Sequence, residues 1–560
     1  MVERRERLLI LGAGVMQGPA INIAKELGLE TVVVDADPRA PWVSMADRFE
    51  QVDLKDKAGI EALGHALKTA GGLAGIMTAG TDFSATVAWT AERLGLPGIP
   101  YEASLNASDK ERMRRCFKAA GVPSPEFIVL TSAEDMRVPL PYPLVVKPVD
   151  NMGARGCRRV DTSEGLPPAV LDALRFSRSG RVIVEAYMEG PEFSVDAIVY
   201  KGEVIICGLA DRHIFFPPYF IEMGHTMPTM VDAETAGALL ATFIQGIKAL
   251  GLATDTAVGA AKGDIKLTPS GPMIGEIAAR LSGGYMSGWT YPYSSGVEPT
   301  RGAILVALGK VPEGLSPTRS WTSAERAFIS IPGTVRSIHG TEKAKAIEYV
   351  QDLFLRIEPG SRVRFPENNV TKCGNIISAA PSRALAVDAA EQAARSILIR
   401  LEASDDETEQ FLTPLSSFLT PPYPPDAFTL PGNLQDLLAA LPESEDAPGQ
   451  DLPMLPGLNG EVLLLPFPEF TGSGLTDYTG RTVAASIEAV RLVTGLPLPL
   501  AEEAGTTGVK TGDQKDGTLI LGHRFWAALI RGGYQGAAYF VERVVQKKGR
   551  CEKRGIRSEE

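Results

Sequence analysis

The stretch GDIKLTPSGPMIGEIAAR, residues 263–280, predicts a β-hairpin that carries acidic side chains. Its centre, Thr268-Pro-Ser-Gly271, suits a tight turn between two antiparallel strands. Because side chains alternate along a strand, the hairpin can bring Asp264 and Glu276 together on one face. Paired carboxylates need a cation or proton between them, so the pattern indicates either a Mg²⁺ site or an exposed, salt-bridged hairpin. Arg280 could neutralise the charge on a phosphoryl group during its transfer.

Two lysines and a glycine-rich segment earlier in the chain indicate a phosphate site. Lys147 ends the apolar strand LVVK, where its ammonium must find an anion or another ligand. The next segment, Asn151-Met-Gly-Ala-Arg-Gly156, lets backbone N–H groups approach phosphate oxygens, and it also carries Arg155. Lys110 opens an earlier helix. No Walker motif occurs, and each lysine alone is better explained as a surface charge, so only the combination predicts a nucleoside triphosphate site.

Residues 182–195, VIVEAYMEGPEFSV, predict a short connection between two strands. The first strand ends at Glu185 and the second begins at Glu192. The backbone near Tyr187 could pair with the edge of an adenine, and Glu192 could accept hydrogen bonds from ribose hydroxyls. Two exposed glutamates in an ordinary turn would explain the same residues.

The N-terminal region predicts a parallel α/β sheet. RLLILGAG, residues 7–14, is typical of a buried strand that runs into a glycine turn, and ETVVVD, residues 30–35, follows as a second strand. The turn has GxGxxxG spacing, which leaves open an NAD site, a substrate or phosphate pocket, or close packing alone. Gly14 in this turn and Asp82 after a later strand are expected at the crevice where open sheets bind ligands.

Composition narrows the class of protein. The 560 residues carry 56 Lys and Arg against 68 Asp and Glu, a net charge of −12, so a nucleic-acid partner is not expected. The five cysteines form no CxxC pair, which argues against a disulfide framework or a zinc site and favours the cytoplasm. No segment has the run of about 18 apolar residues of a membrane helix, and no secretory signal is recognised, so no membrane partner is expected.

The chain is expected to be a multidomain protein of α/β and α+β type. Residues 1–100 form the parallel α/β domain, 101–310 an α+β unit around antiparallel strands, and 311–402 a small α/β lobe. Prolines and acidic residues cluster in 403–460, which is typical of a linker. Residues 461–560 are expected to form a mostly helical C-terminal extension, whose fold and role are not predicted.

Taken in order, these motifs resemble the ATP-grasp superfamily of carboxylate–amine ligases. Within it, the chain resembles L-amino-acid ligases and the ATP-grasp domains of carbamoyl-phosphate synthetase large chain and biotin carboxylase. The resemblance spans about residues 8–400 and implies a pre-ATP-grasp domain, an ATP-grasp fold and a lobe, with ATP and Mg²⁺ or Mn²⁺ as cofactors. By motif position it assigns ATP phosphates to Lys110, Lys147, Gly153, Arg155 and Gly156; adenine to Glu185 and the backbone near Tyr187; ribose to Glu192; metal ions to Asp264 and Glu276; and catalysis to Arg280 and Lys147.

The segment DRHIFFPPYFIEMGH, residues 211–225, resembles one near the acceptor site of amino-acid ligases. There Arg212 would bind a carboxylate, and His213 or His225 would orient an amine. A packed loop with core aromatic residues would explain the segment equally well. Ser282 and Gly283, which follow Arg280 in the sequence, are also placed to contact the acyl substrate.

The resemblance implies an ATP-dependent ligase that joins a small carboxylate to an amine through an acyl phosphate and releases ADP and phosphate. One departure is Ala278, where many relatives have an asparagine that binds the second metal ion. Two alternatives stay open: a carboxylase-like enzyme that activates bicarbonate, and a nucleotide-binding regulatory protein without catalysis. The expected partners are small-molecule carboxylates and amines. The resemblance also allows a homodimer, and it leaves both substrates unidentified.

Overall fold

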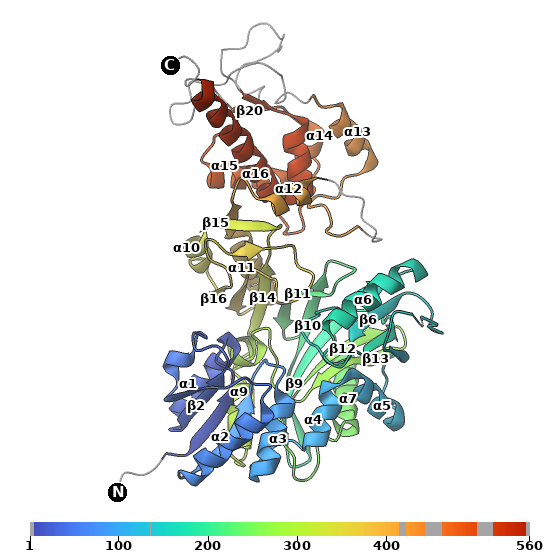
Figure 1. Ribbon diagram of the computed structural model, residues 1–560, viewed down its shortest axis with the longest axis vertical. Coiled ribbons are helices and arrows are strands. Elements are labelled where there is room, and N and C mark those ends of the chain that lie inside the picture. The colour runs from blue at the N-terminus through green and yellow to red at the C-terminus, as the bar shows by residue number, and fades with distance from the viewer. Residues whose placement is uncertain (1–4, 135, 414–421, 443–461, 501–518, 556–560) are drawn as a thin grey trace.

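The computed structural model describes residues 5–134, 136–413, 422–442, 462–500 and 519–555. The molecule is elongated, with the N-terminal domain at one end and the C-terminal extension at the other (Figure 1). No helix among the described residues combines the length and the apolar character that crossing a membrane requires.

The N-terminal domain contains the parallel sheet that the sequence predicts. Its strands lie in the order β3-β2-β1-β4, and all of them pair in parallel. β1 is buried on both faces: Leu8 and Ile10 pack in one core, and Leu9 and Leu11 in the other. The elements are β1 (Arg7–Leu11), α1 (Gly18–Glu26), β2 (Glu30–Asp35), β3 (Arg48–Gln51), α2 (Lys57–Thr69), β4 (Leu73–Thr78) and α3 (Ser84–Leu94).

A small four-stranded sheet follows, with α6 packed against β6 (Figure 1). The strand order is β5-β8-β6-β7, and each pair is antiparallel. Lys147 lies in β6, and Glu185 lies opposite Val145 in the neighbouring β8. The elements are α4 (Tyr101–Ser108), α5 (Lys110–Ala120), β5 (Phe127–Leu130), β6 (Leu144–Pro148), β7 (Arg158–Val160), α6 (Leu166–Phe176) and β8 (Val182–Ala186).

The central element is an antiparallel sheet of eight strands in the order β13-β12-β9-β10-β11-β14-β18-β16. Its last three strands belong to residues 311–402, which the sequence suggests as a separate lobe. They continue the sheet because β14 of this lobe pairs with β11. The elements are β9 (Glu192–Tyr200), β10 (Glu203–Phe215), β11 (Ile221–Met227), α7 (Ala233–Ala249), β12 (Val258–Thr268), β13 (Gly271–Ala278), α8 (Tyr291–Ser294), α9 (Pro299–Ala307), β14 (Thr322–Phe328), β16 (Val350–Leu355) and β18 (Gly374–Ala380).

A three-stranded sheet, β17-β15-β19, joins this lobe to the C-terminal extension. Tyr534 of the extension lies against it, since the phenolic oxygen accepts a hydrogen bond from the backbone N–H of Ile399 at 2.7 Å. The elements are β15 (Gly333–His339), α10 (Thr341–Lys345), β17 (Arg362–Val363), α11 (Arg383–Ser396) and β19 (Leu398–Leu401).

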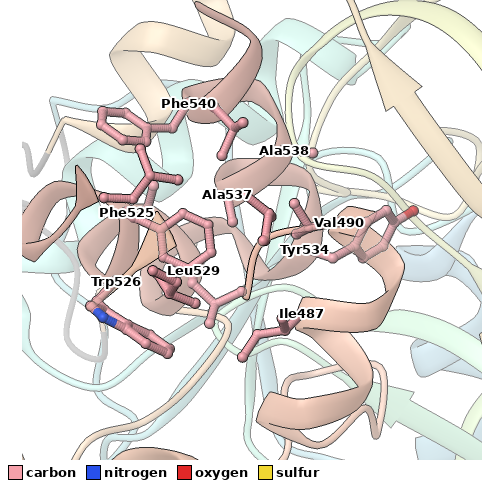
Figure 2. Close-up of a cluster of buried hydrophobic side chains, with 14 of the residues drawn as sticks. Ile487, Val490, Phe525, Trp526, Leu529, Tyr534, Ala537, Ala538 and Phe540 are labelled. Atoms are coloured by element: carbon pink, nitrogen blue, oxygen red, sulfur yellow. The ribbon is translucent and has the colours of Figure 1, made fainter. Parts of the chain in front are cut away.

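The C-terminal extension has its own apolar core, in which Trp526 and Leu529 are fully buried (Figure 2). In the range 403–460, expected to be a linker, the described residues include two helices. Phe428 and Leu434 lie among its prolines and acids and pack in this core. The elements are α12 (Asp406–Leu412), α13 (Gly432–Ala440), β20 (Val462–Leu464), α14 (Pro468–Thr471), α15 (Val483–Thr494), β21 (Leu519–Leu521) and α16 (His523–Gly555), with a non-helical Gly533.

Candidate active site

A cavity of about 370 Å³ lies where the small sheet, the large sheet and the lobe of residues 327–402 meet. Residues from distant parts of the chain share its walls, including Lys147 of β6, Asp264 of β12 and Lys372 before β18. The sequence-predicted site residues that line it are Lys110, Lys147, Gly153, Arg155, Glu185, Tyr187, Glu192, Arg212, His225, Asp264, Glu276, Arg280 and Gly283.

The predicted histidine at position 213 lies outside the cavity. Neighbouring residues of a strand point to opposite faces, so β10 can present only one of Arg212 and His213 to the cavity, and it presents Arg212. His213 Nε2 lies 2.9 Å from the hydroxyl of Thr226. Burial, aided by nearby positive charge, lowers the pKa of His213 to about 3. We therefore withdraw His213 as a residue that orients the amine.

Four further predicted residues do not line the cavity: Gly14, Asp82, Gly156 and Ser282. Asp82 accepts a hydrogen bond from Arg178 at 2.6 Å, and the backbone N–H of Ser282 donates to the buried Asp196 at 2.9 Å. These contacts give both residues a structural role. The N-terminal domain contributes Met16 and Gly80 to the cavity instead.

The two predicted metal ligands face each other. Asp264 and Glu276 are direct partners in the β12–β13 ladder, next to a bulge that shifts the register. Asp264 pairs with Lys262, lies 3.4 Å from Arg212 and accepts a hydrogen bond from Ser194 at 2.9 Å. Burial opposes ionisation of both carboxyls, but the surrounding cations outweigh it and hold both pKa values below the usual range. Both groups are therefore anionic at neutral pH.

Glu185 is engaged by two cations at the floor of the cavity. Its carboxylate lies 2.8 Å from Nε of Arg114 and 2.7 Å from Nζ of Lys147, and it is 2% exposed. Burial raises the pKa of Glu185, but these two cations more than offset the rise and hold it below the usual value. Glu185 thus pairs with Lys147 and lines the cavity, and its predicted contact with adenine stays a prediction.

Two aromatic rings form one side of the cavity. Tyr187 and Phe220 stack with 6.4 Å between ring centroids, and Lys266 lies 4.8 Å from the Tyr187 centroid. The backbone N–H of Tyr187 donates to Pro143 O at 3.0 Å. The contact predicted between adenine and the backbone near Tyr187 stays a prediction, and the ring of Tyr187 also lines the cavity.

The guanidinium of Arg212 is held by carboxylates of the protein. It pairs with Glu192, lies 2.9 Å from Glu222 and 3.4 Å from Asp264, and its side chain is 13% exposed. The sequence predicted a substrate carboxylate at Arg212. In the structure three carboxylates surround this arginine, which also lines the cavity, and its contact with a substrate stays a prediction.

His225 lies beside that network, at 2% exposure. Its Nδ1 contacts Glu325 at 2.7 Å, and its Nε2 lies 3.7 Å from Glu222 without a hydrogen bond to any described residue. Burial raises the pKa of Glu222, but His225, Arg212 and Lys372 outweigh it and hold that pKa well below the usual value. His225 thus lines the cavity, and its Nε2 is buried beside Glu222.

Sequence reasoning missed several charged residues of the cavity. Lys262 lies two residues before Asp264 and therefore on the same strand face, so the alternation of the hairpin could have identified it. Arg356 and Lys372 come from the lobe, and only the sheet order β11-β14-β18-β16 brings them to the cavity. No local sequence pattern marks them.

Comparisons with known proteins agree with this geometry. Residues 140–287 match the ATP-grasp domain family, and residues 327–402 match L-amino acid ligase C-terminal domain 2. The protein y4rH of Sinorhizobium fredii is 27% identical over 70% of this chain and 83% of its own length. Carnosine synthase 1 of Gallus gallus is 25% identical over 56% of this chain, which spans only 36% of that protein.

The fold agrees as well. The crystal structure of an L-amino acid ligase from Bacillus licheniformis superposes with a TM-score of 0.63 at 21% identity, covering 72% of this chain and all of that one. A D-alanine–D-alanine ligase of Ectopseudomonas mendocina is 37% identical over 21% of this chain and 40% of its own length. The chain therefore contains an ATP-grasp domain, followed by a region that matches L-amino acid ligase C-terminal domain 2.

Proposed function

We propose that this protein joins a small carboxylic acid to an amine, with ATP as the energy source and an acyl phosphate as the intermediate. The carboxylate oxygen attacks the γ-phosphorus, the bond to the β-phosphate oxygen breaks and ADP leaves. The amine nitrogen then attacks the acyl carbon, phosphate leaves and the nitrogen loses a proton. The observation that supports this most directly is one cavity in which two facing carboxylates, Asp264 and Glu276, lie among several cations.

The nucleotide fits the half of the cavity nearest the small sheet. Lys110, whose Nζ lies 3.5 Å from Glu276, and Lys147 supply positive charge for the phosphates. Gly153 and Arg155 lie in the segment that would cover those phosphates. The rings of Tyr187 and Phe220 would flank the base, and Glu192 would meet the ribose.

Mg²⁺ fits the donor set, because Asp264 and Glu276 are ionised oxygen ligands and their present partners are cations. Among the described residues no group of three or more His, Cys, Asp or Glu side chains could hold a metal ion alone. A cation held by two carboxylates and by phosphate oxygens satisfies both facts. When bound, Mg²⁺ would reduce the repulsion between the phosphates and the incoming carboxylate.

Two residues at the far end of the cavity match the remaining steps. Arg280 donates to the backbone oxygen of Leu281 at 2.8 Å and lines the cavity, so its guanidinium can stabilise charge on the transferring phosphoryl group. His225 also lines the cavity, and its imidazole would orient the amine. The protein thus contributes mainly positioning and electrostatic stabilisation.

Trapping with hydroxylamine tests the proposal. The protein would be incubated with ATP, Mg²⁺, hydroxylamine and pools of amino acids and other carboxylic acids. An acyl phosphate is expected to react to a hydroxamate and phosphate, with one ADP formed for each hydroxamate. Glu276→Ala should abolish both products because it removes a metal ligand.

AMP and pyrophosphate in place of ADP would contradict the acyl-phosphate mechanism. ATP binding without any acid-dependent ADP would favour a regulatory protein. ADP formed with bicarbonate alone would favour a carboxylase.

A further inference from the structure

Lys372 is a buried lysine without an ion pair. It is 4% exposed, it lines the cavity, and its Nζ donates to the backbone oxygen of Glu222 at 2.6 Å. No carboxylate of the described residues forms an ion pair with it. Burial lowers the pKa of Lys372, although the charges of Glu222 and Glu325 oppose the change. Because a buried ammonium is costly without an anionic partner, its remaining donors are suited to an anion in the cavity.

Arg356 follows β16 and is the second cation that the lobe contributes. Its guanidinium lies 5.8 Å from the ring centroid of Tyr285, and its polar contacts are long: 3.4 Å to the Tyr285 hydroxyl and 3.4 Å to Asn369 O. No described carboxylate pairs with Arg356 either. Its positive charge adds to that of Lys372, since both residues line the same cavity.

Three lysines of the cavity differ from these two because each forms an ion pair with a carboxylate of the protein. Lys147 pairs with Glu185, Lys110 with Glu276, and Lys262 with Asp264. Positive charge not balanced by protein carboxylates therefore accumulates on the lobe side, as well as at Arg280 and Arg155. Arg280 and Arg155 already have a task in the proposed reaction, whereas Lys372 and Arg356 have none.

The segment that contains Asn369 and leads to Lys372 is held in position by two hydrogen bonds. The Asn369 side chain accepts a hydrogen bond from the backbone N–H of Glu222 at 2.8 Å, and the Asn369 N–H donates to Gly153 O at 2.9 Å. The segment that leads to Lys372 thus connects β11, where His225 lies, to the glycine-rich segment. An anion at Lys372 would lie close to the wall where the amine is expected.

We propose that Lys372 and Arg356 form a carboxylate-binding subsite for the amine substrate. The proposal rests on the proposed ligase function. The activated carboxylate and the nucleotide phosphates already have Arg280, Lys110 and Lys147 as cationic partners, so two unpaired cations beyond them match a second carboxylate. The nucleophile is then an amino acid rather than a simple amine, and the amide product keeps a free carboxylate.

The test separates activation of the acid from capture of the amine. Hydroxylamine carries no carboxylate, so hydroxamate formation reports activation alone. Amide formation would be measured with matched acceptors: glycine and glycinamide, L-alanine and L-alaninamide, β-alanine and its amide. The variants are Lys372→Met, of similar shape, and Arg356→Gln. Lys345→Met on α10 is the control, because Lys345 is exposed and pairs only with Glu342 on the same helix.

In the wild type, the acid form of an acceptor should have a lower KM than its amide. In Lys372→Met the KM of the acid form should rise about 10- to 100-fold, the loss expected for a hydrogen bond to a charged group. The KM of ATP, the KM of the amide acceptor and the rate of hydroxamate formation should stay within about twofold. Arg356→Gln should act in the same direction with a smaller change, since that guanidinium is more exposed, and Lys345→Met should have no effect.

Three results would overturn the subsite. The first is equal use of acid and amide acceptors by the wild type. The second is a parallel loss of hydroxamate and amide in Lys372→Met, which would place this residue at the nucleotide or the donor. The third is ADP formation that depends on bicarbonate and is lost in Lys372→Met, which would place the activated substrate there.

A binding measurement decides the matter even if no hydroxamate forms and the proposed function fails. Thermal unfolding with ADP and Mg²⁺ would be followed at rising L-alanine or L-alaninamide. Stronger stabilisation by L-alanine that disappears in Lys372→Met would support the subsite. Equal stabilisation by the two compounds would contradict it.

Discussion

The cavity and the C-terminal core are both buried, but charged side chains surround the first and apolar side chains fill the second. Around the cavity, Arg114, Glu185 and Lys372 are each at most 4% exposed, and all carry charge. In the C-terminal core, Trp526 and Leu529 are fully buried among other apolar side chains (Figure 2). A buried charge without a partner lowers the stability of the fold, whereas an apolar interior depends on filled volume. The first kind of interior can use an unpaired charge to bind a ligand, and the second cannot.

The C-terminal core is nevertheless connected to the cavity through aromatic contacts. Tyr423 packs against Tyr219 with 4.6 Å between ring centroids, and Tyr478 lies 6.1 Å from Phe216. Both contacts fall on the β10–β11 connection, which also carries Phe220 at the cavity wall. The extension therefore supports the aromatic side of the candidate nucleotide site from behind.

The largest effect is expected from removing one partner of the buried charge network. Arg114→Met leaves Glu185 with Lys147 alone and the Gly275 carbonyl without its guanidinium donor. The free energy of unfolding should fall by about 3–5 kcal/mol, the usual cost of breaking a buried ion pair from one side. Urea unfolding followed by circular dichroism would measure the loss.

The adjacent residue provides a matched control for this change. Arg115 is 69% exposed in its side chain and pairs with Glu111 one turn away on α5. Arg115→Met should cost at most about 0.5 kcal/mol, as is usual for exposed pairs. Similar losses for both variants would show that the buried pairing around Glu185 is not special.

Much of the cavity could be predicted because its chemistry is local in sequence. The tight turn predicted the β-hairpin, and the ladder confirms that Asp264 and Glu276 are opposite each other. The register of the turn alone would place Gly275 there, so the bulge after Asp264, which the sequence did not predict, completes the pair. Lys147 at the end of an apolar strand indicated a site in the same way, and this lysine lines the cavity. The parallel N-terminal sheet followed from the repeated change between apolar strands and helices.

The rest depends on contacts between distant segments. Lys372 enters the cavity only because β14 and β18 extend the large sheet, a pairing that no turn or periodicity encodes. Arg114 stands in a helix beside two other arginines, and burial alone distinguishes it. Local sequence reasoning also did not predict the three carboxylates of the protein around Arg212, because Glu192, Glu222 and Asp264 come from three different strands.

A somewhat smaller effect is expected in the C-terminal core. Leu529→Ala would leave a cavity in the core of Figure 2 and should cost about 2–4 kcal/mol in urea unfolding. Because Leu529 has no charge and lies far from the hydroxamate chemistry in sequence and fold, hydroxamate formation at 25 °C should stay within about twofold. Leu492→Ala is the control, since Leu492 on α15 is 62% exposed and should change stability little. A large loss of hydroxamate formation in a still-folded Leu529→Ala would mean that the two regions are coupled more tightly than their contacts suggest.

The smallest expected effect is a loss of stability at alkaline pH, and it arises from a residue of the C-terminal core. Burial raises the pKa of Tyr534 from 10.0 to about 12. Between these values the unfolded chain loses the phenolic proton while the folded protein keeps it, so stability should fall by about 1.4 kcal/mol per pH unit above pH 10. Tyr534→Phe has no phenol to ionise, so its unfolding free energy should fall less steeply than that of the wild type. At pH 11 the variant should have lost about 1.4 kcal/mol less than the wild type. Parallel curves for the two proteins between pH 9 and 11.5 would mean that Tyr534 ionises as readily in the folded state as in the unfolded state. The phenolic oxygen would then be accessible to water rather than buried against β19.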